Sequence, residues 1–326
     1  MPAEWAPHDR CWMAWPCRQE RWGDKIDLAR DCVAQIANAI ADFEPVTMLA
    51  NPENVAEVSL RCGSGVSTLP MLRNDSLVRD MGPSFLIDGR GGHAGVDWLF
   101  DGWSERMVPY DFDAALAAAL LDHVGMERFT PDVVMEPGAF HVDGEGTLIA
   151  TEHSLLSSGR NQGVTSGDLE ALLKAYLGIS KVIWLPQGLA EDSRDQPVED
   201  VARFIAPGVV LALTCDDPSD ANHTALSANL ACLKESTDAQ GRPLQVIEVH
   251  QPAATTADDG RRLGLSYLNF YIANGGVVMP AFEDGKDEAA FAAIRAACPE
   301  REVVQISIVD LMEGAGIHSI TLQQPS

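Results

Sequence analysis

One pattern recurs along this chain: two short apolar runs joined by a tight turn, then an amphipathic helix, then another apolar run. The clearest copy opens with FIAPGVVLALT (204–214), in which Pro-Gly separates two apolar runs and predicts a hairpin. A helix is predicted near 222–233, where three leucines recur at helical spacing, and a strand follows over 244–249. Each copy therefore predicts two hairpin strands, a helix and a third strand.

The same order is expected at three other places. Their hairpins turn at Asp88-Gly89, at Asp143-Gly144 and at the Asn-Gly-Gly of 274–276. The helices that follow are predicted from an Asp113 N-cap to Gly125, from a Ser166 N-cap to Gly178, and over 287–297. Closing strands are expected at 132–135, 181–186 and 302–309. The period is roughly 55 to 65 residues, which indicates a repeat architecture of α/β class.

The two ends of the chain supply the pieces of a fifth unit. The N-terminal part predicts a strand at 11–16, a helix over 26–41 and a strand at 46–50. The tail IHSITLQQP (317–325) is apolar and β-prone, although chain ends usually fray. We therefore expect it to pair with the N-terminal strand and to close a ring of five units, which makes 1–326 a single domain.

Polar residues stand just before each hairpin, at equivalent points of the repeat. They are Asp80, Glu136, Glu199, Ser266 and the pair His318-Ser319. Equivalent positions of a ring meet at one end of its axis, so three carboxylates are expected in one axial pocket. Such a pocket suits an organic cation, above all a guanidinium, whose paired donors match carboxylates. The plainer alternative is that Asp80 pairs with Arg79 or caps a turn.

Two stretches could instead hold a metal ion. One contains His141, Asp143 and Glu145, and the other is DDPSDANH, from Asp216 to His223. Both fit turn chemistry better than metal coordination, because Asp and Asn side chains readily bond to the backbone two residues on. No metal site is predicted.

The composition of the chain limits the classes of partner that it is expected to bind. The net charge is −25, which opposes binding to nucleic acid or to an anionic membrane and favours a small cationic ligand, or simply keeps the protein soluble. Seven scattered cysteines without a CxxC pair indicate reduced thiols and a cytoplasmic location. No stretch has the length of a membrane span, and the N-terminus lacks the apolar region of a signal peptide. The sequence leaves open whether the chain forms a homo-oligomer.

A family resemblance covers nearly the whole chain. MPAEWAPHDRCWMAWP, NDSLVRDMGPSF, EPGAFHVDGEGTLIATE, WLPQGL, YLNFYIANGGVVMPAF and GIHSITLQQP, in this order, resemble motifs of the agmatine deiminase family, close kin of bacterial peptidylarginine deiminases. The resemblance implies a five-bladed α/β-propeller that hydrolyses a guanidinium group and releases ammonia without metal or cofactor. In the family a cysteine thiolate attacks the guanidinium carbon, a histidine moves protons, and two acids hold the nitrogens.

Residue by residue, the resemblance assigns part of this machinery. Asp80 matches the acid of the family's RD motif, and Glu136 matches the glutamate of its EGG motif, here EPG. Ser319 stands at the position of the nucleophilic cysteine, since IHCITQQ has become IHSITLQ. Pro197 stands at the position of the histidine, since DGHVDN has become DQPVED, and Glu199 replaces the neighbouring aspartate. Leu77 replaces a tryptophan beside the substrate.

Three functions stay open at this point. The first is an agmatine deiminase-like hydrolase with an altered site, in which Ser319, Asp80 and Glu199 are catalytic and Asp80, Glu136, Glu199 and Leu77 contact substrate. The second is a pseudoenzyme that binds a cationic guanidino compound or amine. The third is a hydrolase or transferase with a repurposed site, for which His153 is the candidate substitute base. His318 is expected to be a structural hydrogen-bonding residue, because neighbours on a strand face opposite sides.

Overall fold

The computed structural model describes residues 1–156, 161–190, 197–257, 260–311 and 315–326 of the chain. None of the helices within these ranges combines the length and the apolar character that a bilayer crossing requires.

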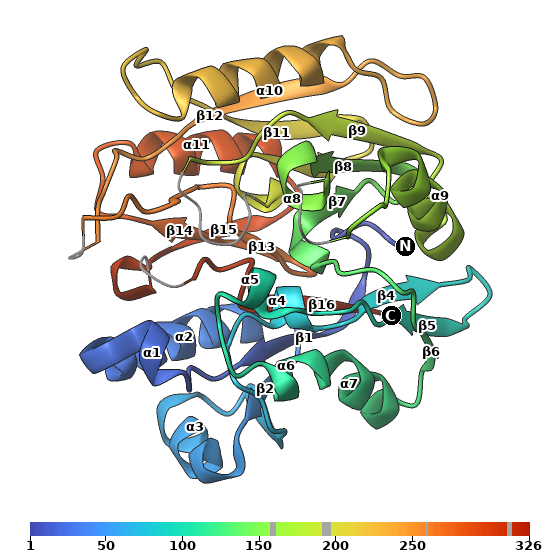
Figure 1. Ribbon diagram of the computed structural model, residues 1–326. Helices are drawn as coiled ribbons and strands as arrows, with labels where there is room; N and C mark the ends of the chain where they lie inside the picture. The colour runs from blue at the N-terminus through green and yellow to red at the C-terminus, as the bar shows by residue number, and fades with distance from the viewer. Residues whose placement is uncertain (157–160, 191–196, 258–259, 312–314) are drawn as a thin grey trace.

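The described part of the chain contains five sheets. Each of them includes an antiparallel pair of strands followed by a parallel strand, and one sheet has a fourth strand. Four sheets are contiguous in sequence: β4 (Ser84–Ile87), β5 (His93–Val96) and β6 (Glu127–Phe129); β7 (Phe140–Val142), β8 (Thr147–Thr151) and β9 (Lys181–Leu185); β10 (Ala202–Ala206), β11 (Val209–Thr214) and β12 (Gln245–His250); β13 (Tyr271–Ile272), β14 (Gly276–Ala281) and β15 (Glu302–Ser307). Figure 1 shows the sheets following one another around the molecule in chain order.

The fifth sheet joins the two ends of the chain, as predicted. Its strands are β16 (Thr321–Pro325), β1 (His8–Ala14), β2 (Val46–Ala50) and β3 (Val66–Pro70), in that spatial order. β16 runs antiparallel to β1 with Trp12 opposite Leu322, and the Trp12 indole donates to Gln324 Oε1 at 3.0 Å. All residues from 317 to 325 are buried, β16 included, which explains why a terminal segment carries apolar and β-branched side chains.

The long helices connect the hairpins to their third strands. They are α2 (Ile26–Ala41), α7 (Leu116–Val124), α9 (Ser166–Leu177), α10 (His223–Glu235) and α11 (Asp287–Ala297). Shorter turns of helix fill the loops: α1 (Gln19–Trp22), α3 (Val55–Arg61), α4 (Val78–Met81), α5 (Gly102–Glu105), α6 (Asp111–Ala114), α8 (Glu152–Leu156), and the 3₁₀ turns η1 (Gly23–Lys25), η2 (Pro52–Asn54), η3 (Pro137–Ala139), η4 (Val198–Asp200) and η5 (Val309–Leu311).

Three local predictions are wrong in detail. Thr165, not Ser166, caps α9: its hydroxyl accepts from the Asp168 amide, and the Asp168 carboxylate accepts from the Thr165 amide. Asp113 does not cap a helix but lies inside α6, where it is fully buried. The strand expected at 132–135 contributes an isolated bridge between Leu99 and Val134, and β6 takes its place in the sheet.

The corrected cap of α9 can be tested by substitution. Thr165→Ala removes an acceptor for an otherwise unpaired amide, so the free energy of unfolding should fall by about 1 kcal/mol. Ser166→Ala is the matched control, because Ser166 occupies the first helical position and should change stability by a few tenths of a kcal/mol or less. Urea unfolding of both variants measures this difference in the free energy of unfolding. An equal loss of stability in both variants would contradict the assignment of Thr165 as the cap.

Candidate functional site

Ser319 lies in a turn of residues 317–320 that leads into β16. The prediction that Ser319 lies on the strand itself is therefore wrong. Thr321 closes this turn, because its hydroxyl donates to the carbonyls of Ile317 and His318 at 2.9 and 3.0 Å. The Arg79 amide donates to the Ser319 carbonyl at 3.1 Å, which joins the turn to α4. The Ser319 side chain is completely buried, and its hydroxyl donates to Glu199 Oε1 at 2.6 Å.

Two of the predicted acids, Asp80 and Glu199, meet at Gly138. Asp80 lies on α4, Gly138 on η3 and Glu199 on η4, and η3 packs against both of the other elements. A Cβ atom at Gly138 would overlap Asp80 Oδ1 and lie 3.2 Å from Glu199 Oε2. Glycine at this position therefore leaves room for both carboxylates where a side chain would otherwise lie. Glu136, the third predicted acid, is buried immediately before η3.

Trp103 orients Asp80 and was not anticipated from the sequence. Its indole N–H donates to Asp80 Oδ2 at 3.0 Å. The segment labelled α5 is a left-handed turn in which Trp103, Ser104 and Glu105 have φ of 55°, 62° and 60°. Such angles cost energy for residues other than glycine and persist where the surroundings enforce them. Here the burial of the indole and its hydrogen bond to Asp80 offset the energy of these backbone angles. In the sequence, Gly102 is the local residue that indicates an unusual turn.

Glu199 accepts hydrogen bonds from three described side chains. Besides Ser319, the Asn269 amide donates to Oε1 at 3.2 Å, and His318 Nδ1 lies in very short contact with Oε2. Asn269 also donates to Asp200 Oδ1 at 2.6 Å, so it bridges two acids. Donors around a carboxylate favour its ionised form. Glu199 is therefore well suited to hold a cation and poorly suited to take a proton from serine.

His318 is a hydrogen-bonding residue, as expected, and it reaches Ser319 only through Glu199. Its Nδ1 faces Glu199, and its Nε2 lies 2.7 Å from Glu4 Oε1. Each ring nitrogen thus faces a carboxylate oxygen, so the imidazole bridges Glu199 and Glu4. A continuous chain of hydrogen bonds runs from Ser319 through Glu199 and His318 to Glu4.

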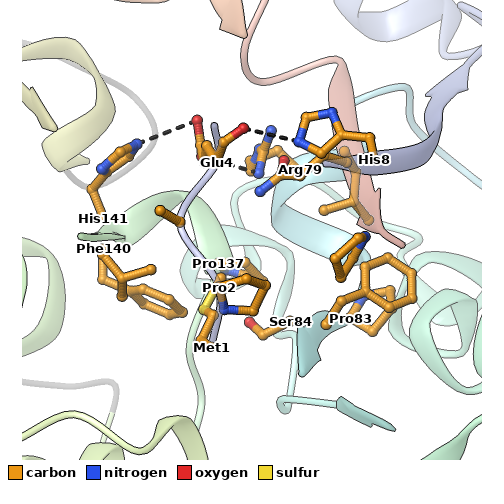
Figure 2. Close-up of a pocket in the computed structure, with 16 residues that line it drawn as sticks. Met1, Pro2, Glu4, His8, Arg79, Pro83, Ser84, Pro137, Phe140 and His141 are labelled. Atoms are coloured by element: carbon orange, nitrogen blue, oxygen red, sulfur yellow. Dashed lines mark hydrogen bonds and ion pairs between the residues drawn. The ribbon is translucent and has the colours of Figure 1, made fainter. Parts of the chain in front are cut away.

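Glu4 is the second residue that the sequence did not reveal. Arg79 Nη1 lies 3.3 Å from its Oε1, while His141 Nε2 lies 3.2 Å from Oε2 and Arg203 Nη2 is in very short contact with it. Figure 2 shows Glu4 between His141 on one side and Arg79 and His8 on the other, beside a cavity of about 20 Å³. Burial alone would raise the pKa of Glu4, but the surrounding cations, His318 and Arg203 foremost, hold it well below its ordinary value.

Glu4, His141 and His318 are close enough to share a metal ion, but their hydrogen bonds do not suit one. The Phe204 amide donates to His141 Nδ1 at 3.3 Å, so the proton of a neutral ring stays on Nε2, the atom that faces Glu4. A metal would need that lone pair and would also lie beside two guanidinium groups. The cluster is better described as a carboxylate held by four cationic or donor side chains.

The other predicted residues fall outside this cluster or stay untested. Asp143 accepts from the amides of Glu145 and Thr147, which is turn chemistry as expected, while His141 turns away to Glu4. Leu77 is fully buried in the hydrophobic core next to α4, and Pro197 is buried at the start of η4. His153 is exposed on α8. Contact of Leu77 with substrate and a catalytic role for His153 remain predictions.

A network of buried charges supports the loop that leads into α4. Asp113 Oδ1 accepts from the amides of Asn74 and Asp75 at 2.7 and 3.1 Å. The Asp75 carboxylate lies 3.0 Å from Arg18 Nε and 2.8 Å from Arg21 Nη2. Burial, with the nearby Asp75 carboxylate, raises the pKa of Asp113 to about 7. The position of Asp80 thus depends on a helix, α6, that lies some thirty residues further along the chain.

The chain is similar over its whole length to proteins of known family and to solved structures. The family model for Porphyromonas-type peptidyl-arginine deiminase matches residues 1–325. The agmatine deiminase of Pseudomonas aeruginosa (strain UCBPP-PA14) is 39% identical over 350 residues, covering 100% of this chain and 95% of that protein. The agmatine deiminase of Stutzerimonas stutzeri is 38% identical with the same coverage. The solved structure of Enterococcus faecalis agmatine deiminase superposes with a TM-score of 0.96 at 32% identity, over 100% of this chain and 95% of that one.

The charge state of Asp113 gives a pH-dependent test of the loop network. Because its folded pKa lies above the unfolded value, Asp113 favours the folded state below about pH 4, and this contribution is lost as the pH rises to about 7. Asp113→Asn cannot ionise, so its free energy of unfolding relative to wild type should rise over this range by at most about 4 kcal/mol. Urea unfolding at pH 5 and pH 8 measures the change. Asp111→Asn, at an exposed position of α6, is the control, and parallel profiles for wild type and Asp113→Asn would contradict the prediction.

Proposed function

Since the chain belongs to the Porphyromonas-type peptidyl-arginine deiminase family, we propose that it binds a small guanidino compound between Asp80 and Glu199 and acts on a C–N bond of that group as a hydrolase. Ser319 takes the position of the nucleophile in this proposal. Asp80, Glu136 and Glu199 bind the substrate, and Leu77 lies beside it. Five blades of one α/β-propeller, closed by β1 and β16 over residues 1–326, form the scaffold, and the seven free thiols suit a cytoplasmic location.

One observation carries the proposal: the carboxylates of Asp80 and Glu199 both approach the position that a side chain at Gly138 would occupy, and Glu199 also bonds to Ser319. A guanidinium placed there could donate to both carboxylates and present its carbon near the Ser319 hydroxyl. Two carboxylates that meet at one point favour a positively charged ligand between them.

The chemistry that Ser319 can perform is limited by its partner. To attack the guanidinium carbon, the hydroxyl would pass its proton to Glu199 and form a C–O bond; Glu199 would then return that proton to one nitrogen, so that the C–N bond breaks and ammonia leaves, and water would hydrolyse the O-linked amidine-like intermediate and free the serine. Glu199 already accepts from His318 and Asn269, which makes it a weak base. Position 197, the family's position for a proton-transferring histidine, is proline and has no titratable group. Turnover of agmatine is expected to be slow.

The same observation favours a second candidate, a protein that binds a cationic guanidino compound or amine without turnover. A neutral serine that donates to Glu199 leaves the negative charge of the pocket in place. Binding therefore needs neither a nucleophile nor a base. A third candidate, in which His153 serves a different reaction on another substrate, requires the exposed ring on α8 to act at the site.

The activity test uses agmatine and ammonia release. An ordinary enzyme turns over about 10 times per second, and this chain should be at least about 10³-fold slower. Ser319→Cys should remain slow as well, because Pro197 still supplies no base. Ser266→Cys, at another buried serine of the repeat, controls for the effect of a new buried thiol. An ordinary rate for wild type, or full activity for Ser319→Cys, would overturn the account of Ser319 and Pro197.

Binding is tested separately by thermal shift with agmatine, arginine and putrescine. At a concentration of 100 times Kd, a ligand adds about 2.7 kcal/mol to the free energy of unfolding, so Tm should rise by several degrees. Agmatine should shift Tm more than putrescine, which lacks the guanidinium fork. Asp80→Asn should abolish the shift, whereas Asp111→Asn should retain it. Equal shifts in wild type and Asp80→Asn would place the ligand elsewhere.

A further inference from the structure

The N-terminal segment reaches the centre of the molecule through a single side chain, Glu4. Glu4 is the fourth residue of the sequence. The amino group of Met1 donates to the Leu177 carbonyl at 2.7 Å. The residue Glu4 is 6% exposed. Its carboxylate contacts side chains from four parts of the chain, namely Arg79, His141, Arg203 and His318. A carboxylate this buried is costly unless it is well paired, so its place is strongly fixed.

One of these contacts leads to the proposed ligand site. Glu4 Oε1 holds His318 Nε2 at 2.7 Å, and the opposite ring nitrogen, Nδ1, holds Glu199 Oε2. The imidazole is rigid and planar, so a bond at one nitrogen sets the direction of the other. Glu199 is in this way presented with Oε1 toward Ser319 and Oε2 toward His318 and Gly138.

We propose that Glu4 is a positioning residue of the cation site: through His318 it fixes the orientation of Glu199 and so sets the affinity for a guanidinium. The inference rests on the proposed function only in naming the ligand. The route from Glu4 to Glu199 is defined by hydrogen bonds between described residues. Glu4 does not contact the ligand in this account, and it acts only through the imidazole.

The test is a double-mutant cycle on affinity for agmatine, measured by calorimetry. Glu4→Gln keeps the size of the side chain and removes its charge, and it should weaken binding about tenfold. His318→Asn keeps a donor near the Nδ1 position for Glu199 but cannot reach Glu4, and it should weaken binding by a similar factor. Because both changes break the same chain, the double variant should bind no more than about twofold worse than His318→Asn alone. Glu4→Asp, which keeps the charge, should recover part of the loss.

Asp238 provides the matched control. It is another buried acid, and it accepts from the amides of Gln240 and Arg242 at 2.9 Å, with no bond to Glu4, His8 or His318 among the described residues. Asp238→Asn should leave agmatine affinity within about twofold of wild type. An unchanged affinity in Glu4→Gln, a loss of equal size in Asp238→Asn, or losses that multiply to about a hundredfold in the double variant would each overturn the proposal.

A second readout does not require any ligand. Proton NMR of the wild-type protein should show two slowly exchanging ring N–H signals from His318, one for each carboxylate partner. Glu4→Gln should shift or remove the Nε2 signal and broaden the Nδ1 signal, since the ring then loses an anchor. If wild type binds no guanidino compound but these signals behave as stated, the proposed function fails while the positioning role stands. If the Nδ1 signal is identical in both proteins, Glu4 does not position the ring.

Discussion

The carboxylate of Glu4 is the interaction on which the arrangement of the site depends. Arg79 precedes β4, His141 lies on β7, Arg203 on β10 and His318 before β16, so the cationic and donor side chains around Glu4 come from segments of four sheets. Each of these groups would be costly to bury alone. Pairing them with one shared anion removes that cost and brings the inner edges of four sheets to a common point. The geometry at Ser319 is a consequence of this convergence.

Much of the scaffold was predictable because it is encoded locally. The predicted helices at 26–41 and 287–297 match α2 and α11 residue for residue, since their apolar spacing is a property of the segment itself. The pairing of β16 with β1 followed from counting the pieces of a repeat. The turn that carries Ser319 was mistaken for strand because Ile317, Ile320 and Thr321 are β-prone. The turn is defined by backbone bonds and by the Thr321 hydroxyl, and none of these can be read from the sequence.

The site was predictable only in part, and the missing residues share a physical reason. Asp80, Glu199 and Ser319 occupy equivalent points of the repeat, so the sequence could bring them together. Glu4 and Trp103 belong to irregular segments outside the strands and long helices that define the repeat, and their roles depend on partners from other segments. No spacing pattern in the sequence predicts the role of a single acid in an N-terminal segment or of a tryptophan in a left-handed turn. Such residues are found through the hydrogen bonds that they complete.

The replacements at positions 319 and 197 make sense together when charge is considered. In the family that the chain belongs to, as the resemblance implies, a thiolate at position 319 would add a negative charge and a histidine at 197 could balance it. The neutral Ser319 hydroxyl adds none, and it keeps a donor 2.6 Å from Glu199. A protonated histidine at 197 would then face the guanidinium without a thiolate to offset it and would oppose binding. Under the proposed function, proline at 197 therefore suits a serine at 319, and both residues leave in place Asp80 and Glu199, the acids proposed to bind the cation.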